Sequence, residues 1–210
     1  MSNSPATLTL PLKLDLTLAP SPDTQRILAA LGILPISDAA APLIGPETTT
    51  SRCPAFTPPA IGQYWPGQGG FYGGILPAIL DQPAAHMVWS EKEWEDFAWG
   101  ERGHDIVGAR SRINGQVNTR AMLAVGNCPA AIVANNYRQD DHADFFLPSQ
   151  YQLFIASLLA PVLFKKEGWY WSSTQLSADF AFVQDFEGGG SGWDSKDLEF
   201  RVRALRLIQL

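Results

Sequence analysis

The sequence predicts an α+β protein in which a short N-terminal appendage precedes one larger domain. Segments near both ends of the chain alternate apolar and polar residues with a period of two, as β-strands do. Three segments between residues 119 and 161 instead carry apolar residues at helical spacing. A proline-rich stretch over residues 35–60 reads as an extended connector, which places a domain boundary near residue 55.

Composition indicates a globular protein and argues against some classes of partner. Of the 210 residues, 46% are hydrophobic and 17% are charged, which fits a packed core rather than disorder. The net charge of -6 argues against a nucleic-acid partner, because a phosphate-backbone binder needs a basic surface. No apolar run approaches the roughly 20 residues of a membrane helix, so we expect no membrane insertion.

The N-terminus and the cysteines indicate the cellular compartment in which the protein is made. The first residues lack the basic and apolar regions of a signal peptide, so we expect synthesis in the cytoplasm. Action outside the cell would then need another route, such as a virus particle. With only Cys53 and Cys128, the chain is not a disulfide-stapled miniprotein. We expect two separate thiols, and a Cys53–Cys128 bond stays open.

The N-terminal segment, residues 1–55, is expected to serve in attachment or oligomerisation. Leucine occupies every second position over residues 8–18, which predicts a strand or hairpin with one apolar face. Either a neighbouring subunit or the chain's own larger domain would cover that face. A helix of about two turns should follow, with Ser21 or Asp23 as its cap, Pro22 in its first turn and Gly32 at its end.

The larger domain, residues 56–210, should begin with strands and continue with helices. Glycines mixed with aromatics over residues 61–80 predict short strands joined by tight turns. Residues 84–90 read as a strand, and the polar, acidic residues 91–100 as a loop or short helix. Helices are expected over 119–125, from Pro129 to about Tyr137, and from Pro148 or Ser149 to about Pro161. The last should bury Leu153, Phe154, Leu158 and Leu159.

The C-terminal segment, residues 169–206, has packed ends around a polar, glycine-rich middle. It opens with the aromatic residues 169–171 and closes with an apolar and basic run over 200–206. Between them, residues 178–186 alternate, so that Phe180, Phe182, Gln184 and Phe186 share one strand face. The pattern predicts a rigid frame that holds a surface loop, where recognition residues usually lie.

Several separated sequence motifs resemble one known family. They are Asn114-Gly115 with Asn118-Thr119, Pro129-Ala130-Ala131, residues 144–149, Tyr170-Trp171-Ser172-Ser173-Thr174 and Arg201-Val202-Arg203. Their order and spacing, over about residues 61–210, resemble the Lcl C-terminal domain family of bacteria and phages. The opening run 64–70 looks like its phage and prophage members. Departures occur at Phe145, Phe146, Gln152 and Ala204, where the family usually has Trp, Tyr, an acidic residue and Pro.

This resemblance implies a fold and a function. The family is similar in fold to C-type lectins and to the formylglycine-generating enzyme, so residues 56–210 are expected to form a C-type lectin-like domain. Relatives of that fold include phage receptor-binding tips and adhesins. The implied function is therefore ligand or receptor binding on a virion or cell surface, with a host-cell surface protein or glycan as partner. Homotrimers recur among such proteins, so self-association as a trimer is expected.

The expected ligand-binding residues lie in the C-terminal segment. They are Gln175, Ser177, Asp179, Phe180, Gln184, Ser191, Trp193, Asp194, Ser195, Asp197, Leu198 and Glu199. A tryptophan in a glycine-rich loop has few neighbours to bury it, and tryptophan is enriched in binding hot spots. The alternative for Trp193 is that it folds back onto the domain. Phe182 and Phe186 are expected in the core, and Arg201 and Arg203 in ion pairs of the frame.

Some fold relatives are variable proteins of diversity-generating retroelements, which mutate adenines in codons near the C-terminus. Residues that such mutagenesis of Asn codons yields are Ser177, Asp179, Phe180, Ser191, Asp194, Ser195, Asp197 and Leu198. Gln184, Trp193, Lys196 and Glu199 do not arise this way unless other codons were hit. Diversification of this segment is therefore a hypothesis.

Metal binding and catalysis are not expected. Asp140, Asp141, His142 and Asp144 cluster in the sequence, and oxygen ligands such as these carboxylates suit calcium. A charged run before a helix is more often a solvated loop, so no cofactor is predicted and calcium stays open. The chain has no cysteine after Cys128, whereas formylglycine-generating enzymes use paired cysteines late in the chain. A structural tail-assembly protein and a degenerate enzyme of that type are the alternatives to a binding protein.

Overall fold

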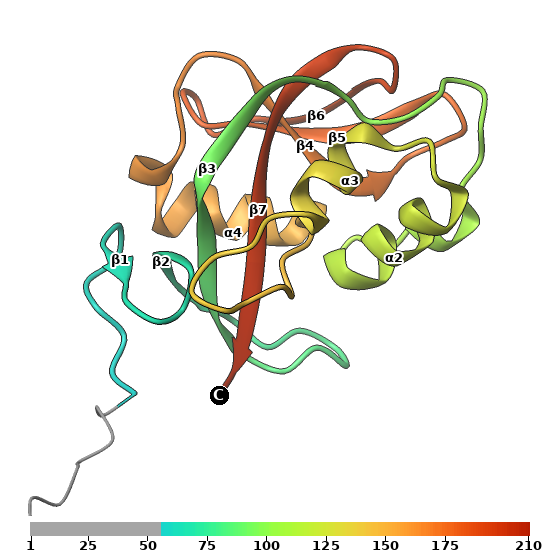
Figure 1. Cartoon of the computed structure of the whole chain (residues 1–210). Helices are drawn as coiled ribbons and strands as arrows, with labels where there is room; N and C mark the ends of the chain where they lie inside the picture. Colours follow the sequence, from blue (N-terminus) through green and yellow to red (C-terminus); the bar gives the residue numbers. More distant parts are fainter. Residues whose placement is uncertain (1–55) are drawn as a thin grey trace, which may run out of the picture. The chain divides into compact units, whose positions relative to one another are not determined.

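The computed structural model describes residues 56–210, which form one mixed seven-stranded sheet with three α-helices (Figure 1). The strand order is β1-β2-β3-β7-β4-β5-β6. The strands are β1 Tyr64–Trp65, β2 Gly70–Leu76, β3 Ala85–Ala98, β4 Trp169–Gln175, β5 Phe180–Asp185, β6 Ser191–Ser195 and β7 Glu199–Gln209. The helices are α2 Gly115–Val125, α3 Pro129–Asn135 and α4 Gln150–Leu159, with 3-10 turns η1 Val107–Ala109 and η2 Pro161–Leu163. The predicted N-terminal strand, helix and connector lie outside the described residues.

Two long antiparallel strands, β3 and β7, run side by side through the middle of the sheet (Figure 1). The predicted strand over 84–90 is confirmed, but the prediction of a loop or short helix over 91–100 is wrong. The chain continues as β3 to Ala98 because Glu93 and Trp94 pair with Arg203 and Val202 of β7. A register shift between Trp89 and Glu93 breaks the alternation that would have marked this stretch as a strand.

The three predicted helices are confirmed, and their caps explain where they begin. The Asn114 side chain accepts a hydrogen bond from the Val117 N–H at 3.0 Å, so α2 starts four residues earlier than its apolar pattern. Gly126 ends α2 in the left-handed conformation, with φ of 85°. Ser149 and Gln152 form a reciprocal capping box at the start of α4.

The packing of α4 differs from the prediction. Leu153 and Ala156 face the core, whereas Phe154, Leu158 and Leu159 are exposed. At 100° per residue, Phe154 and Leu158 lie on the side of the helix that points away from the sheet. The sequence did not indicate which apolar residues of α4 would be buried, because α4 carries apolar residues on every side.

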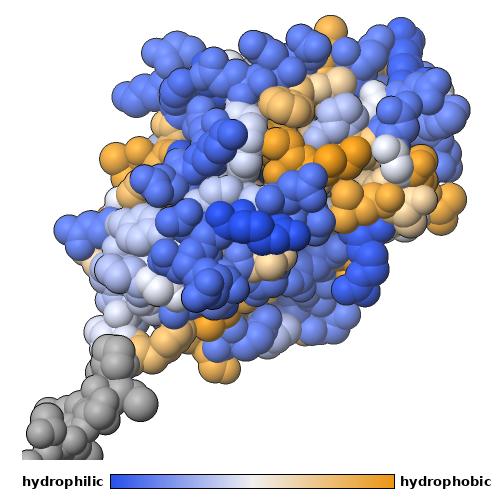
Figure 2. Space-filling view, viewed as in Figure 1, coloured by the Kyte–Doolittle hydropathy of each residue, from blue (hydrophilic) through white to orange (hydrophobic). Residues whose placement is uncertain are grey.

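The sheet separates two apolar clusters. Tyr170 and Trp171 are neighbours on β4 and point to opposite faces, as successive strand residues do. Trp171 packs in the cluster with Met122 of α2 and Ala130 of α3, and Tyr170 packs in the cluster with Leu153 of α4. Phe182 and Phe186 are buried as predicted. On the face shown in Figure 2, apolar surface gathers over α2 and α3, and most of the remaining surface is hydrophilic.

These facts correct the expected fold class. We expected an α+β, C-type lectin-like domain, and residues 56–210 are instead mostly β, built on a single mixed sheet. No feature of this sheet and its three helices identifies the C-type lectin-like fold. The sequence could not reveal the arrangement because the sheet depends on pairing between β3 and β7, which lie about a hundred residues apart in the chain.

A partly buried ion cluster joins β3, β4 and β7. Glu93 lies within 3.2 Å of Arg201 and 3.4 Å of Arg203, and it accepts a hydrogen bond from the Tyr170 hydroxyl at 2.6 Å. Burial, and then the neighbouring Glu93 carboxylate, raises the pKa of Tyr170. Hydrogen bonds from Lys165 and then Arg201 lower the pKa of Glu95 to about 2. The predicted ion-pairing of Arg201 and Arg203 in the frame is confirmed.

Cys128 is buried, and burial raises the pKa of its thiol to about 11. Cys53 lies outside the described residues, so the expectation of two separate thiols stays a prediction and a Cys53–Cys128 bond stays open. Within residues 56–210, none of the helices combines the length and the apolarity needed to cross a membrane.

Candidate ligand-binding surface

The structure separates the twelve predicted ligand-binding residues into buried and accessible ones. Gln175 and Gln184 are buried, with exposed fractions of 3% and 2%. The Gln184 amide binds Ser191 and the Gly190 carbonyl, and Gln175 binds the Ile106 N–H and Lys196. These two residues therefore support the surface instead of forming it. The others are partly or fully exposed: Ser177, Asp179, Phe180, Ser191, Trp193, Asp194, Ser195, Asp197, Leu198 and Glu199.

Trp193 lies in a strand rather than in the predicted loop. It is the central residue of β6, which forms one edge of the sheet and pairs only with β5. Its side chain is 60% exposed, although it stands directly opposite the buried Phe182. Within residues 56–210, β6 is an edge strand and no further strand lies beside the tryptophan. The alternative in which Trp193 folds back onto the domain is therefore not what the structure contains.

A hollow of about 400 Å³ lies beside β6. It is lined by Arg112, Ile113, Gln150, Tyr151, Phe154 and Ser191. Ser191 stands opposite Gln184, and Trp193 opposite Phe182, so both β6 side chains lie on the same face of the sheet. The Arg112 guanidinium lies 5.2 Å from the centre of the Phe182 ring on that face. Trp193 and the hollow are therefore parts of one surface, which we call the β6 groove.

A second group of predicted residues lies at the end of the sheet where two turns meet. The Lys196 N–H donates to the Asp179 carbonyl at 3.0 Å, which joins the β6–β7 turn to the β4–β5 turn. Arg102 reaches the same place and pairs with the Asp179 carboxylate at 3.3 Å. We call this end of the sheet the tip; its predicted residues are Ser177, Asp179, Phe180, Ser195, Asp197 and Leu198. Asp194 points to the opposite face from Trp193 because it neighbours it in β6.

A fully buried lysine, Lys196, lies beneath the surface of the tip and contacts the residues that hold it in place. The Lys196 ammonium donates to the His104 carbonyl and to the Gln175 side chain, each at 2.6 Å, and lies 4.6 Å from the centre of the Trp99 ring. Gln175 in turn donates to Asp105. Three separate stretches of chain are tied together in this way. Sequence reasoning missed the role of Lys196, because a lysine between Ser and Asp in a polar turn gives no sign of burial.

Burial makes the charge of Lys196 costly. Its pKa is lowered from the ordinary value of 10.5 to about 8, chiefly by removal from water and against the attraction of Asp105. Between these two pH values the folded chain has released a proton that the unfolded chain retains. Since the unfolded state binds more protons there, the contribution of Lys196 to the free energy of unfolding rises with pH.

We therefore expect the wild type to gain stability over Lys196→Met as the pH rises from about 7.5 to about 9.5. The other titrating groups, including the tyrosines, are present in both proteins. Their contributions therefore cancel in the difference between the two free energies of unfolding. Urea unfolding of both proteins at several pH values measures the difference in their free energies of unfolding. Parallel pH profiles would show that Lys196 does not titrate in this window.

The acidic run before α4 is held by protein donors. Asp140 accepts hydrogen bonds from the Tyr64 hydroxyl at 2.9 Å and from the N–H groups of Gly67 and Gly69 at 2.8 and 3.2 Å. These bonds, with Tyr64 first, lower the pKa of Asp140. Asp144 pairs with Arg206 at 2.7 Å. Over residues 56–210 no group of three or more acidic, histidine or cysteine side chains is placed to hold a metal ion.

Comparison with known proteins adds no family to this description. No protein-family model matches the chain, and no curated protein matches it. The resemblance to the Lcl C-terminal domain family stays a prediction that rests on the residues quoted for it.

Residues of the β6 groove outside the C-terminal segment were not predicted as ligand contacts. Arg112, Ile113, Tyr151 and Phe154 come from two distant stretches of the chain. The signal that could have found Phe154 is its place on α4, where it shares the outward side with Leu158. Nothing in the sequence places these residues next to Ser191.

Proposed function

We propose that this protein binds a ligand or receptor through noncovalent contacts of the β6 groove and the tip. The observation that carries the proposal is the 60% exposure of Trp193 on an edge strand, on the same face as a largely apolar hollow of about 400 Å³. An exposed tryptophan beside an apolar hollow with a few polar groups is typical of binding sites. Arg112 and Gln150 supply polar groups that would fix the orientation of a ligand.

A host-cell surface protein or glycan is the proposed partner, and a phage tail or a cell surface the proposed location. Aromatic side chains such as Trp193, Tyr151 and Phe154 suit either partner, since they offer large apolar area at a low cost in conformational entropy. A homotrimer would multiply modest contacts into high avidity. The partner, the location and the trimer are proposed from the family resemblance and not from the geometry of the site.

Diversification of the tip by a retroelement remains a proposal with some support from the geometry. The eight residues compatible with adenine mutagenesis are all at least partly exposed. Of the four incompatible residues, Gln184 and Lys196 are buried, whereas Trp193 and Glu199 are exposed. The test is to sequence the flanking DNA for a near-copy of the segment encoding residues 172–206, mismatched mainly at adenines. Absence of such a copy would leave a fixed-specificity binder.

Trp193→Ala tests the proposed function. We expect binding to host cells to weaken by about tenfold or more, because a hot-spot residue contributes about 2 kcal/mol or more. The free energy of unfolding should stay within about 0.5 kcal/mol of the wild type, since the side chain is mostly exposed. A binding titration on cells, with thermal unfolding in parallel, measures both.

Trp169→Ala is the matched control. Trp169 is also an exposed tryptophan, but it lies beside Gly192 on the other face of the sheet, away from the β6 groove. Its removal should leave binding unchanged. Equal binding by the wild type and Trp193→Ala would contradict the proposal and favour a structural tail-assembly protein.

A further inference from the structure

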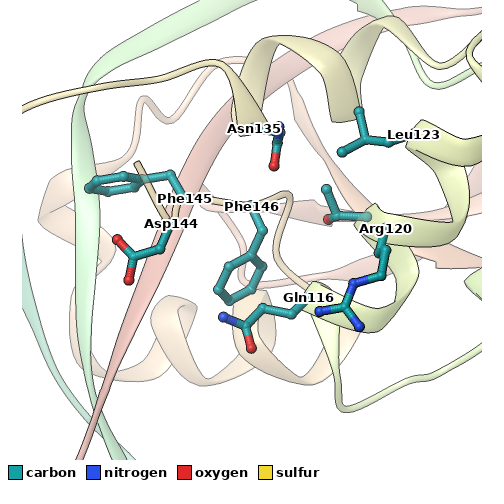
Figure 3. Close-up of a pocket in the computed structure, with 8 residues that line it drawn as sticks. Gln116, Arg120, Leu123, Asn135, Asp144, Phe145 and Phe146 are labelled. Atoms are coloured by element: carbon teal, nitrogen blue, oxygen red, sulfur yellow. The ribbon is translucent and has the colours of Figure 1, made fainter. Parts of the chain in front are cut away.

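A second hollow, of about 280 Å³, lies between α2, α3 and the segment 144–146 (Figure 3). It is lined by Gln116, Thr119, Arg120, Leu123, Asn135, Asp144, Phe145 and Phe146. None of these residues belongs to the β6 groove or the tip. Figure 3 shows Asp144 on one side and Arg120 on the other, with Phe146 between them and Gln116 beside Arg120. The hollow therefore has an anionic end and a cationic end.

Arg120 is unusual among the arginines of residues 56–210. Every other arginine there has an ion pair, a hydrogen bond or an aromatic ring as its partner. No hydrogen bond or ion pair joins Arg120 to any described residue. Among residues 56–210 its five N–H donors have no acceptor, and a guanidinium can hold a planar anion in two parallel hydrogen bonds. In a protein with a net charge of -6, a guanidinium at a hollow that has no partner within residues 56–210 points to an anionic ligand.

The other polar groups of the hollow are also available. The side-chain amides of Gln116 and Asn135 make no hydrogen bond within the described residues. Asp144 uses Oδ1 to accept from Arg206 at 2.7 Å, and its Oδ2 has no hydrogen-bond partner among residues 56–210. The pairing with Arg206 holds the Asp144 carboxylate in place while Oδ2 remains an acceptor. The apolar floor comes from Leu123 and Phe146.

We propose that this hollow binds a small carboxylate that also carries a hydroxyl or ammonium group. The carboxylate would sit in the fork of the Arg120 guanidinium, and the hydroxyl or ammonium group would donate to Asp144 Oδ2. Gln116 and Asn135 have both donors and acceptors to bind the middle of the ligand. At 280 Å³ the hollow lies just below the about 300–1,000 Å³ of most small-molecule sites, so a single sugar or amino acid fits.

Acidic sugars and free amino acids share this chemistry, and titrations with defined compounds separate them. Glucuronate is compared with glucose, and alanine with alaninamide, because each pair differs in the negative charge. We expect saturable binding of at least one carboxylate below about 10 mM in calorimetry at low salt. The uncharged or amidated counterpart should bind at least about tenfold more weakly. Whichever carboxylate binds more tightly identifies the source of the ligand.

Arg120→Gln should weaken that binding by about tenfold or more, and Arg120→Lys should restore only part of it because lysine lacks the planar fork. Lys166→Gln is the matched control, since it removes the same charge from an exposed side chain outside the hollow. Trp193→Ala should also bind normally, so failure of this proposal is distinct from failure of the proposed function. Equal binding by the wild type and Arg120→Gln, or saturation by neither carboxylate, would overturn the proposal.

Discussion

Replacing Arg203 by methionine is expected to lower the free energy of unfolding by about 3–5 kcal/mol. The Arg203 side chain is 7% exposed and donates to the carbonyls of Ser90, Leu163 and Glu91. Its guanidinium also lies 5.5 Å from the centre of the Phe164 ring. Methionine fills much of the volume but leaves three carbonyls without this donor. It also removes one of the cations beside Glu93. Urea denaturation of the purified protein measures the loss.

Two other arginine substitutions serve as comparisons for Arg203→Met. Arg203→Lys should restore little, because an ammonium cannot reproduce the planar set of donors. Arg120→Met removes an exposed arginine without a partner among residues 56–210 and should change stability by no more than about 0.5 kcal/mol. If Arg203→Met were as mild as Arg120→Met, the ion cluster would contribute little to the stability of the fold.

Trp99→Ala is expected to lower the free energy of unfolding by a similar amount, about 3–5 kcal/mol. Trp99 is fully buried, and its ring N–H donates to the Ser172 carbonyl at 2.7 Å. Its loss would leave a cavity, an unpaired carbonyl and a buried Lys196 without the ring beside its ammonium. Trp99→Phe keeps an aromatic ring and should lose less.

Hydrogen exchange adds a local readout for Trp99. The backbone N–H of Trp99 donates to the Lys196 carbonyl at 3.0 Å, so the two residues are joined through main chain as well as side chains. Amides of the β6–β7 turn should therefore exchange faster in Trp99→Ala than amides of β3 near Met87. Trp193→Ala serves as the comparison, because that exposed tryptophan should not affect the turn. Uniform acceleration throughout the sheet would mean that Trp99 supports the whole domain and not the tip in particular.

The helices could be predicted because their signals are local. Asn114, Ser149 and Gln152 cap helices through residues only three positions away, and Gly126 ends α2 by its own backbone conformation. The second half of β3 could not be predicted in this way. Its residues are polar on both faces, and what fixes them as a strand is pairing with β7 and the contact of Glu93 with Arg203.

The binding surface could be predicted only in part. The exposure of Trp193 follows from its polar, glycine-rich surroundings, which the sequence displays. The hollow beside it is assembled from residues near 112, 150 and 191, so its composition depends on the tertiary fold. Burial of Gln175, Gln184 and Lys196 likewise depends on partners from other segments, and the polarity of these residues suggested the opposite.

The buried position of Lys196 affects how freely the residues of the tip can be substituted. Its contacts to Gln175, to the His104 carbonyl and to the Trp99 ring lie beneath the surface and involve no exposed tip side chain. Exposed positions such as Asp197 and Leu198 therefore contribute little to the interior. A combinatorial library randomised at those positions should yield mostly folded proteins, whereas one randomised at Lys196 should not. The same separation would let natural variants change the exposed surface of the tip without a loss of stability.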